Sequence, residues 1–197
     1  MDSISADELQ RLQDQSFLLS KKNIDQKVTK LLISSQEELA GWINQHTPAL
    51  TDGMSLQPRK IAKGENYADM PYWVSDFPAD MKGKDIWTYR SVVWWGHGIS
   101  FSIILAGKFK KKVELNLAGL KAPGNYFTVG HSPWSLEFTD ENQKLCIDLS
   151  VEEMTEHFKN NHFVKIARQE KLENINNLPG LSVLCFEKLI KGLSNLA

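Results

Sequence analysis

Two runs of residues, at 86–95 and 99–105, are rich in aromatic and β-branched side chains. Such side chains favour β-strands because they pack well on a pleated, half-buried surface. Between the runs stands Gly96-His97-Gly98, whose length and glycine content are typical of a hairpin loop. The sequence therefore predicts a tryptophan-rich antiparallel hairpin in the middle of the chain.

The length of the hairpin loop decides which side chains share a face of the sheet. With a three-residue loop, Trp95 lies opposite Ile99. The same register places Arg90 opposite Ile104. A two-residue loop would exchange the faces of one strand relative to the other. We favour a three-residue loop because the apolar side chains of both strands then gather on the odd-numbered face, which we expect in the core. The even-numbered face is mixed, and its members are Thr88, Arg90, Val92, Trp94, Ser100, Ser102 and Ile104.

Helix starts are marked by the motif Ser-x-x-Glu, in which the serine hydroxyl and the glutamate carboxylate satisfy free amides of the first turn. The motif occurs at residues 5–8, 35–38 and 150–153, and we expect a helix to begin at each of them. Apolar residues of the C-terminal segment recur at every fourth position, which predicts a last helix over 178–196.

The other candidate strands are short and are bounded by Gly, Pro and Asp. They cover residues 56–62, 72–75, 126–129, 134–138, 145–148 and 163–168. Residues 113–120 fit either a helix or a strand, and we favour a strand or irregular structure. Because the strands run together and the helices flank them, the predicted fold class is α+β, with a mostly antiparallel sheet of about five to seven strands.

We expect one domain over residues 1–197. In it, an N-terminal helical segment, 1–47, packs on the sheet region, 55–170, after a linker near 47–55. The formal net charge of −1 gives no general attraction to nucleic acid or to an anionic membrane. The basic cluster at 108–112 is typical of a solvated sheet edge, so nucleic acid is not an expected partner.

The first residues are acidic and polar, unlike a signal peptide, and no apolar run approaches the roughly 20 residues of a spanning helix. We therefore expect a cytoplasmic protein without membrane contact. Cys146 and Cys185 stand among core-type neighbours, which favours buried thiols over a disulfide.

The mixed face of the hairpin is the candidate site. A guanidinium such as that of Arg90 can bind a carboxylate or phosphate with two parallel hydrogen bonds, and the indole of Trp94 can stack on a ligand. The plainer interpretation, which we favour, is a structural ion pair of Arg90 with Asp76 or Asp85 beneath a covering helix. We expect Trp95 in the core, and His97 exposed at the tip of the loop.

A central block of motifs resembles a group of uncharacterised bacterial proteins. The block comprises Glu65-Asn66-Tyr67, Met70-Pro71-Tyr72, Asp76-Phe77-Pro78, Asp85-Ile86, Arg90 and Trp94-Trp95-Gly96-His97. The resemblance implies no activity. It implies that Asn66, Tyr72, Asp76 and Arg90 belong to one structural unit, with residues 65–78 forming a hairpin or an extended loop beside the Arg90 strand.

Common catalytic and cofactor motifs are absent from the sequence, and no cofactor or metal is predicted. Glu153 and His157 share a helix face, but without an HExxH motif a solvated face is the better interpretation. Gly130-His131-Ser132 does not form a nucleophile elbow, and Gly96-His97-Gly98 lacks the helix that completes a phosphate-binding loop.

Two functions remain open. The one we favour is a non-catalytic binding or interaction module for a small polar or anionic ligand or a peptide. The alternative is an enzyme in which Arg90 anchors an anionic substrate and Asp76 or His97 is the acid or base. No catalytic set is assigned, and the candidate ligand-binding residues are Arg90, Trp94, His97, Ser100, Ser102, Tyr72 and Asp76. A protein partner and self-association to a homo-oligomer also stay open.

Overall fold

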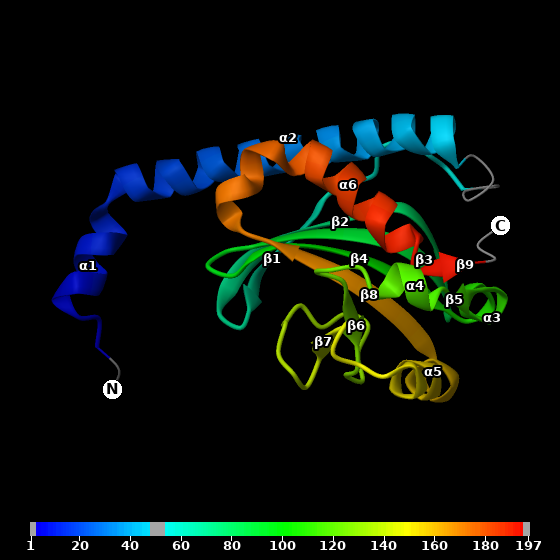
Figure 1. The fold of residues 1–197 in the computed structure, drawn as a ribbon. Coiled ribbons are helices and arrows are strands. Elements are labelled where there is room, and N and C mark those ends of the chain that lie inside the picture. Colours follow the sequence, from blue (N-terminus) through cyan, green and yellow to red (C-terminus); the bar gives the residue numbers. More distant parts are fainter. Residues whose placement is uncertain (1–2, 48–53, 195–197) are drawn as a thin grey trace.

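The structure, a computed structural model, describes residues 3–47 and 54–194. Most of the linker expected near 47–55 and the last residues of the helix expected over 178–196 lie outside the described residues. The described chain forms one twisted sheet with helices on one face, and a long helix continues beyond the sheet (Figure 1).

The main sheet has seven strands, and each pair of neighbours is antiparallel. In their order across the sheet they are β1 (Ala62–Tyr67), β2 (Met70–Lys82), β3 (Asp85–Trp94), β4 (Gly98–Ala106), β8 (Phe163–Glu170), β6 (Tyr126–Thr128) and β7 (Gln143–Leu145). A small second sheet pairs β5 (Glu114–Leu115) with β9 (Leu193–Ser194). With helices before and after the sheet, the predicted α+β class is confirmed.

The helices vary widely in length. They are α1 (Ala6–Gln13), α2 (Gln15–His46), α3 (Lys108–Lys112), α4 (Leu117–Leu120), α5 (Val151–Asn160), the 3-10 helix η2 (Leu172–Asn177) and α6 (Leu178–Ile190). Helix α6 packs on β4 and β8, and α2 packs on β2 and on α6. Figure 1 shows both helices above the same face of the sheet.

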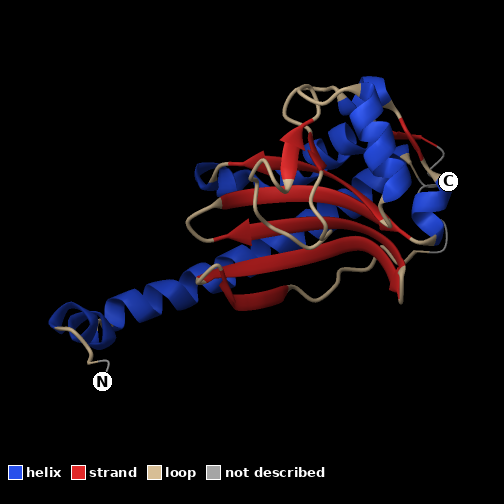
Figure 2. Cartoon of the chain, turned by 90° about the horizontal axis from the view of Figure 1, so that it is seen from below, coloured by secondary structure: helices blue, strands red, loops and turns tan. Residues whose placement is uncertain are grey.

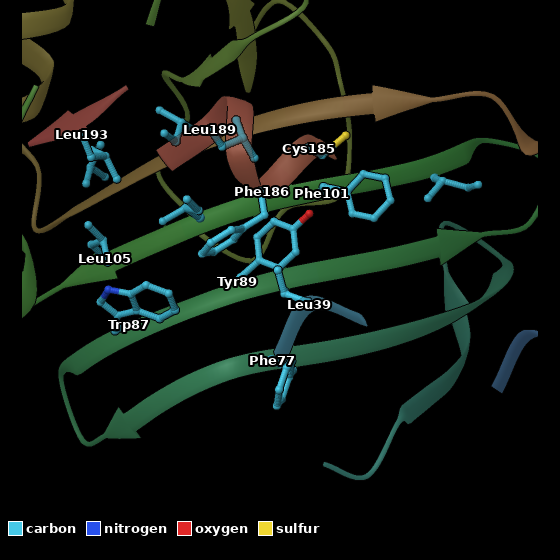
Figure 3. Close-up of a cluster of buried hydrophobic side chains, with 14 of the residues drawn as sticks. Leu39, Phe77, Trp87, Tyr89, Phe101, Leu105, Cys185, Phe186, Leu189 and Leu193 are labelled. Carbon is cyan, nitrogen blue, oxygen red and sulfur yellow. The ribbon is translucent and has the colours of Figure 1, made fainter. Parts of the chain in front are cut away.

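The main core lies between these two helices and the odd-numbered face of the β3–β4 hairpin. Tyr89 is at its centre: its ring stacks on Phe101 with centroids 6.2 Å apart and meets the edge of Phe186 at 5.0 Å (Figure 3). The Tyr89 hydroxyl donates a 2.7 Å hydrogen bond to the Ser182 carbonyl of α6. The hydroxyl therefore has a hydrogen-bond partner although it is buried in the core.

The opposite face of the sheet is covered by residues 129–142, which we call the strap. The strap contains no helix or strand, and loops cross the strands on this side in Figure 2. Leu136 of the strap packs into a second, smaller apolar cluster with Val74, Val92 and Trp94. The expected covering helix is therefore wrong, because an irregular segment covers this face.

Two of the three expected helix starts are confirmed, since complete capping boxes at Ser5 and Ser150 open α1 and α5. The start expected at Ser35 is wrong. Ser35 lies inside α2 and its hydroxyl donates to the Leu31 carbonyl. The apolar stripe that includes Leu32 and Leu39 is buried against the sheet on both sides of Ser35, so packing keeps the helix continuous.

Two expected strands, 56–62 and 134–138, are wrong because side chains bind their backbone groups in place of a neighbouring strand. The Gln36 side chain accepts from the Arg59 amide at 2.5 Å and donates to the Arg59 carbonyl at 3.1 Å. In the strap, the Tyr67 hydroxyl accepts from the Leu136 amide at 3.1 Å. The strand expected at 145–148 is β7, which lies slightly earlier.

The hairpin faces and the three-residue loop are confirmed, but the loop lies one residue earlier than expected, so each cross-strand partner is shifted by two residues. Trp94 pairs with Gly98 and Arg90 with Ser102, so the loop is Trp95-Gly96-His97. Trp95 leaves the ladder because its amide donates to the Pro71 carbonyl at 3.0 Å and its ring packs on Trp73, 5.9 Å away. Both strands slip together, so even-numbered residues still share one face.

Candidate functional site

Arg90 and Asp76 form a bidentate ion pair on the mixed face. They are cross-strand partners on β3 and β2. Arg90 Nε and Nη2 donate to the two carboxylate oxygens of Asp76, each at 2.8 Å, and the Thr88 hydroxyl donates to Oδ1 at 3.0 Å. The paired side chains are 15% and 19% exposed. Between the two partners considered in the sequence, Asp76 and Asp85, the structure selects Asp76.

The strap places an aromatic ring over this pair. The guanidinium carbon of Arg90 lies 4.3 Å from the ring centroid of Trp134. Cation–π contacts of this kind are attractive, more so when partly shielded from water. Two of the five N–H groups of Arg90 and one face of its guanidinium are thus engaged within the protein, and an anionic ligand would have to compete with Asp76.

Trp94 lies in an aromatic group rather than on an open surface. Its ring meets Tyr67 edge-to-face at 5.2 Å, and its indole N–H donates to the Tyr67 carbonyl at 3.2 Å. Tyr72 meets Tyr67 at 5.9 Å, and its ring lies over Gly64, where any side chain would clash. His97 is exposed, as expected, and stacks on Trp94 with ring centroids 3.5 Å apart.

Little space for a ligand lies beside the two serines of the candidate set. Ser102 is buried beside Arg90, whereas Ser100 is half-buried and lines a hollow with Trp94, His97 and Leu136. This hollow has a volume of about 10 Å³. A cavity needs roughly 10–15 Å³ for a single water molecule, so the hollow does not admit a metabolite while the strap is in place.

Sequence reasoning missed Lys165, which is the most deeply buried charged side chain of this face. It lies on β8, is 5% exposed, and donates a 2.7 Å hydrogen bond to the Ser135 carbonyl of the strap. Burial, helped by the positive charge of Arg90 and opposed by Glu137, lowers the pKa of Lys165 to about 7. A lone lysine inside the apolar run 163–167 was the available signal.

Glu137 and Tyr67 hold the other end of the strap. The Tyr67 hydroxyl donates to Glu137 at 2.7 Å, and the Ser135 hydroxyl donates to the same carboxylate oxygen at 2.5 Å. Burial raises the pKa of Glu137, but these two hydrogen bonds, a hydrogen bond of its own backbone and the charge of Lys165 together outweigh burial and leave the pKa below its usual value. The charged groups under the strap are therefore matched by partners from the same chain.

A second candidate surface lies at the other end of the molecule, on residues 3–27, which we call the arm. It comprises α1 and the part of α2 that precedes Val28, the first buried residue of that helix. None of its residues is buried. Its large apolar side chains are 42–66% exposed, and they are Ile4, Leu9, Leu12, Phe17, Leu18, Leu19 and Ile24.

The arm continues the apolar stripe of α2 past the edge of the sheet. Residues Phe17 and Ile24 lie on nearly the same side of the helix as Val28 and Leu32, because seven or eight positions make about two turns. Figures 1 and 2 show α1 and the start of α2 extending away from the body. The sequence signal was the run Phe17-Leu18-Leu19, since three consecutive apolar residues span more than one helix face.

Two ion pairs join the part of the arm nearest the body to the sheet. Lys21 contacts Glu65 at 2.8 Å, and Asp25 contacts Lys63 at 2.5 Å, both across to β1. At the other end, Asp14 ends α1 and begins α2, since its carboxylate accepts from the amides of Ser16 and Phe17 at 2.9 and 3.1 Å. The arm therefore bends at Asp14 (Figure 1).

The remaining candidate groups do not form a site. Glu153 is engaged in the cap of α5, and His157 packs against Phe127 with ring centroids 5.5 Å apart. Within residues 3–47 and 54–194, no three His, Cys, Asp or Glu side chains come close enough to hold a metal ion. Over the same part of the chain, each helix is too short or too polar to cross a membrane.

Comparisons of the chain with protein-family models, with curated proteins and with solved structures found no match.

Proposed function

We propose that the protein is a non-catalytic interaction module, and that its arm is the surface that binds a helical protein partner. The observation that carries this proposal is the exposure of seven large apolar side chains on a segment with no buried residue. Exposed apolar clusters of this size mark interaction surfaces in soluble proteins.

The helical form of the arm adds support. An isolated helix shorter than about 12–15 residues is marginal in water, and most helical stability in proteins comes from a packed apolar face. Helix α1 has eight residues and buries none of them. A partner that covers Leu9 and Leu12 would supply the missing packing, in the way that an amphipathic helix docks on an apolar surface.

The proposal places the protein in the cytoplasm, as the sequence suggests. Cys146 and Cys185 are free thiols in the core. Burial raises the pKa of Cys146 to about 12 and that of Cys185 to about 11, so neither is a reactive thiolate near neutral pH. Neither thiol supplies a nucleophile, which is in keeping with a non-catalytic role.

The test is a photoreactive amino acid introduced at position 18 in the full chain, in living cells. The matched control carries it at position 147, where Ile147 is comparably exposed on the body. The proposal predicts covalent protein adducts from position 18 that disappear with Phe17→Ser and Ile24→Ser, and none from position 147. Equal labelling from both positions, or none from position 18, would rule out the arm as a binding surface.

A second candidate function is the binding of an anionic small molecule at Arg90, as a binding site or as the anchor of an enzyme. The partial exposure of Arg90 and Asp76 favours it, together with the buried amine of Lys165. A thermal-shift screen of wild type and Arg90→Lys against inorganic phosphate and simple dicarboxylates tests it. A stabilisation of wild type that the variant lacks is the expected result, and equal responses would exclude this candidate.

A further inference from the structure

We infer that the partner of the arm is the arm of a second copy of the chain, and that the two arms run antiparallel about a two-fold axis near Phe17. This inference rests on the proposed function, because it names the partner of that same surface. Three features of the arm carry it: its charge distribution, its apolar residues and its bend.

The charges of the arm are separated along its length. In residues 3–14 the acidic Asp7, Glu8 and Asp14 outweigh Arg11. Residues 15–27 carry a net positive charge, because they contain one acidic residue, Asp25, and three basic residues, Lys21, Lys22 and Lys27. The helix dipole accounts for the acidic residues in the first turn of α1. Lys21 is paired with Glu65 of β1. Lys22 and Lys27 are therefore the lysines of α2 that the inference assigns to contacts with the second copy.

An antiparallel pair of arms makes this separation complementary. Around an axis near Phe17, the acidic part of each arm lies beside the basic part of the other, so that Asp7 faces the region of Lys27. A two-fold interface is made by the same patch on both copies. A patch with opposite charges at its two ends is complementary to itself in such an interface. A parallel pair would place like charges side by side.

The apolar residues supply enough surface for a stable pair. If each copy covers about five of them, and each side chain loses on the order of 100 Å², two copies bury about 1,000 Å² of apolar surface. That is near the lower limit of specific interfaces before any polar contact is added. Phe17 and Leu18 lie at the axis and would meet their own counterparts.

The bend at Asp14 gives each arm a concave side. A hollow of about 560 Å³ lies inside it, lined by Asp7, Gln10, Arg11, Gln13, Asp14 and Phe17. A lysine of a partner helix would meet the carboxylate of Asp14 and the ring of Phe17 there. It would share Asp7 with Arg11, whose Nε lies 3.0 Å from the Asp7 carboxylate. The two bodies then lie at opposite ends, with their first buried residues (Val28 in each) roughly 33 Å apart at 1.5 Å per residue, so the bodies leave room for the arms.

The experiment uses two full-length charge variants whose changes leave both caps intact. One carries Asp7→Lys and Gln10→Lys, and its arm is basic over most of its length. The other carries Lys22→Glu and Lys27→Glu, and its arm is mostly acidic. The matched control is Lys144→Glu with Lys188→Glu on the body. Sedimentation velocity of each protein, from nanomolar to high micromolar concentration, gives the dimer dissociation constant.

The inference predicts that wild type and the control variant dimerise, and that each charge variant alone dissociates roughly ten-fold or more easily. An equimolar mixture of the two charge variants should form a dimer at least as stable as that of wild type. A wild type dimer that both variants retain would overturn the antiparallel arrangement. A wild type that stays monomeric throughout would overturn self-association, while cross-links from position 18 to another protein would leave the proposed function standing.

Discussion

The arm and the strap-covered face distribute polarity in opposite ways. Under the strap, charged side chains such as Arg90 and Lys165 are shielded from water, and each has a partner within the chain. On the arm, apolar side chains such as Phe17 and Leu18 are each 53% exposed and pack against neither apolar cluster of the described residues. Charge on a sheet face therefore does not by itself indicate a binding site, and the surface that we propose for binding is instead the uncovered apolar one.

The largest effect should follow from breaking the ion pair of the covered face. Arg90→Ala leaves the Asp76 carboxylate partly buried without its cation, and removal of one partner from a shielded pair is strongly destabilising. We expect the free energy of unfolding in urea to fall by about 3 kcal/mol. The matched variant is Arg90→Met with Asp76→Leu, which should recover most of the loss. A loss below about 1 kcal/mol for Arg90→Ala would mean that the pair does not hold this face.

A pH dependence should reveal the buried amine of Lys165. Its pKa is about 7 in the folded protein, against 10.5 unfolded, so the unfolded state binds more protons between these values. Stability therefore rises with pH through this window, by about 2 kcal/mol from pH 7 to 9. Lys165→Met should lose this rise, and Lys144→Met, at an exposed position, should keep it. If stability depended on pH in the same way for wild type and Lys165→Met, burial would not lower the pKa of Lys165.

The contact of Trp134 with Arg90 should contribute less. Trp134→Ala removes a cation–π contact that is still partly open to solvent, for which about 1 kcal/mol is typical. The expected outcome in urea unfolding is a drop of that size that vanishes when Arg90 and Asp76 have already been replaced. An equal drop in both backgrounds would assign it to general packing of the strap.

The smallest effect on stability should come from the arm. Phe17→Ser with Leu18→Ser replaces half-exposed side chains that pack against neither apolar cluster of the described residues. The free energy of unfolding of the dilute protein should therefore change by less than about 0.5 kcal/mol. The same substitutions should abolish association. If they destabilised the dilute protein as Arg90→Ala does, the arm would be packed on the body, and the contrast between the two regions would fail.

Local patterns predicted the fold class, the capped helices and the faces of the hairpin. They failed where a distant side chain decides the structure. Gln36 holds the backbone of Arg59, and Tyr67 holds that of Leu136, so both segments resemble strands in composition but cannot pair as strands. Continuity of α2 through Ser35 depends in the same way on packing over the sheet, which no local motif encodes.

The candidate site, too, was predicted only where a local pattern determines the structure. Pattern alone identified the mixed face and Arg90 on it, because alternation along a strand fixes which side chains share a side. It left Asp76 and Asp85 open as the partner of Arg90. It could not identify the strap, since an irregular segment has no periodicity, nor that Lys165 lies beneath it. The arm was counted as a helix packed on the sheet, because its apolar residues look the same whether or not another element covers them.

Amide hydrogen exchange of the wild-type protein at several concentrations tests the central claim most directly. If the arm is completed by a second copy, amides of residues 6–27 should exchange fast in dilute solution. Their protection should grow with concentration, while the β3–β4 hairpin stays equally protected throughout. Exchange in the arm that is the same at every concentration would contradict the account.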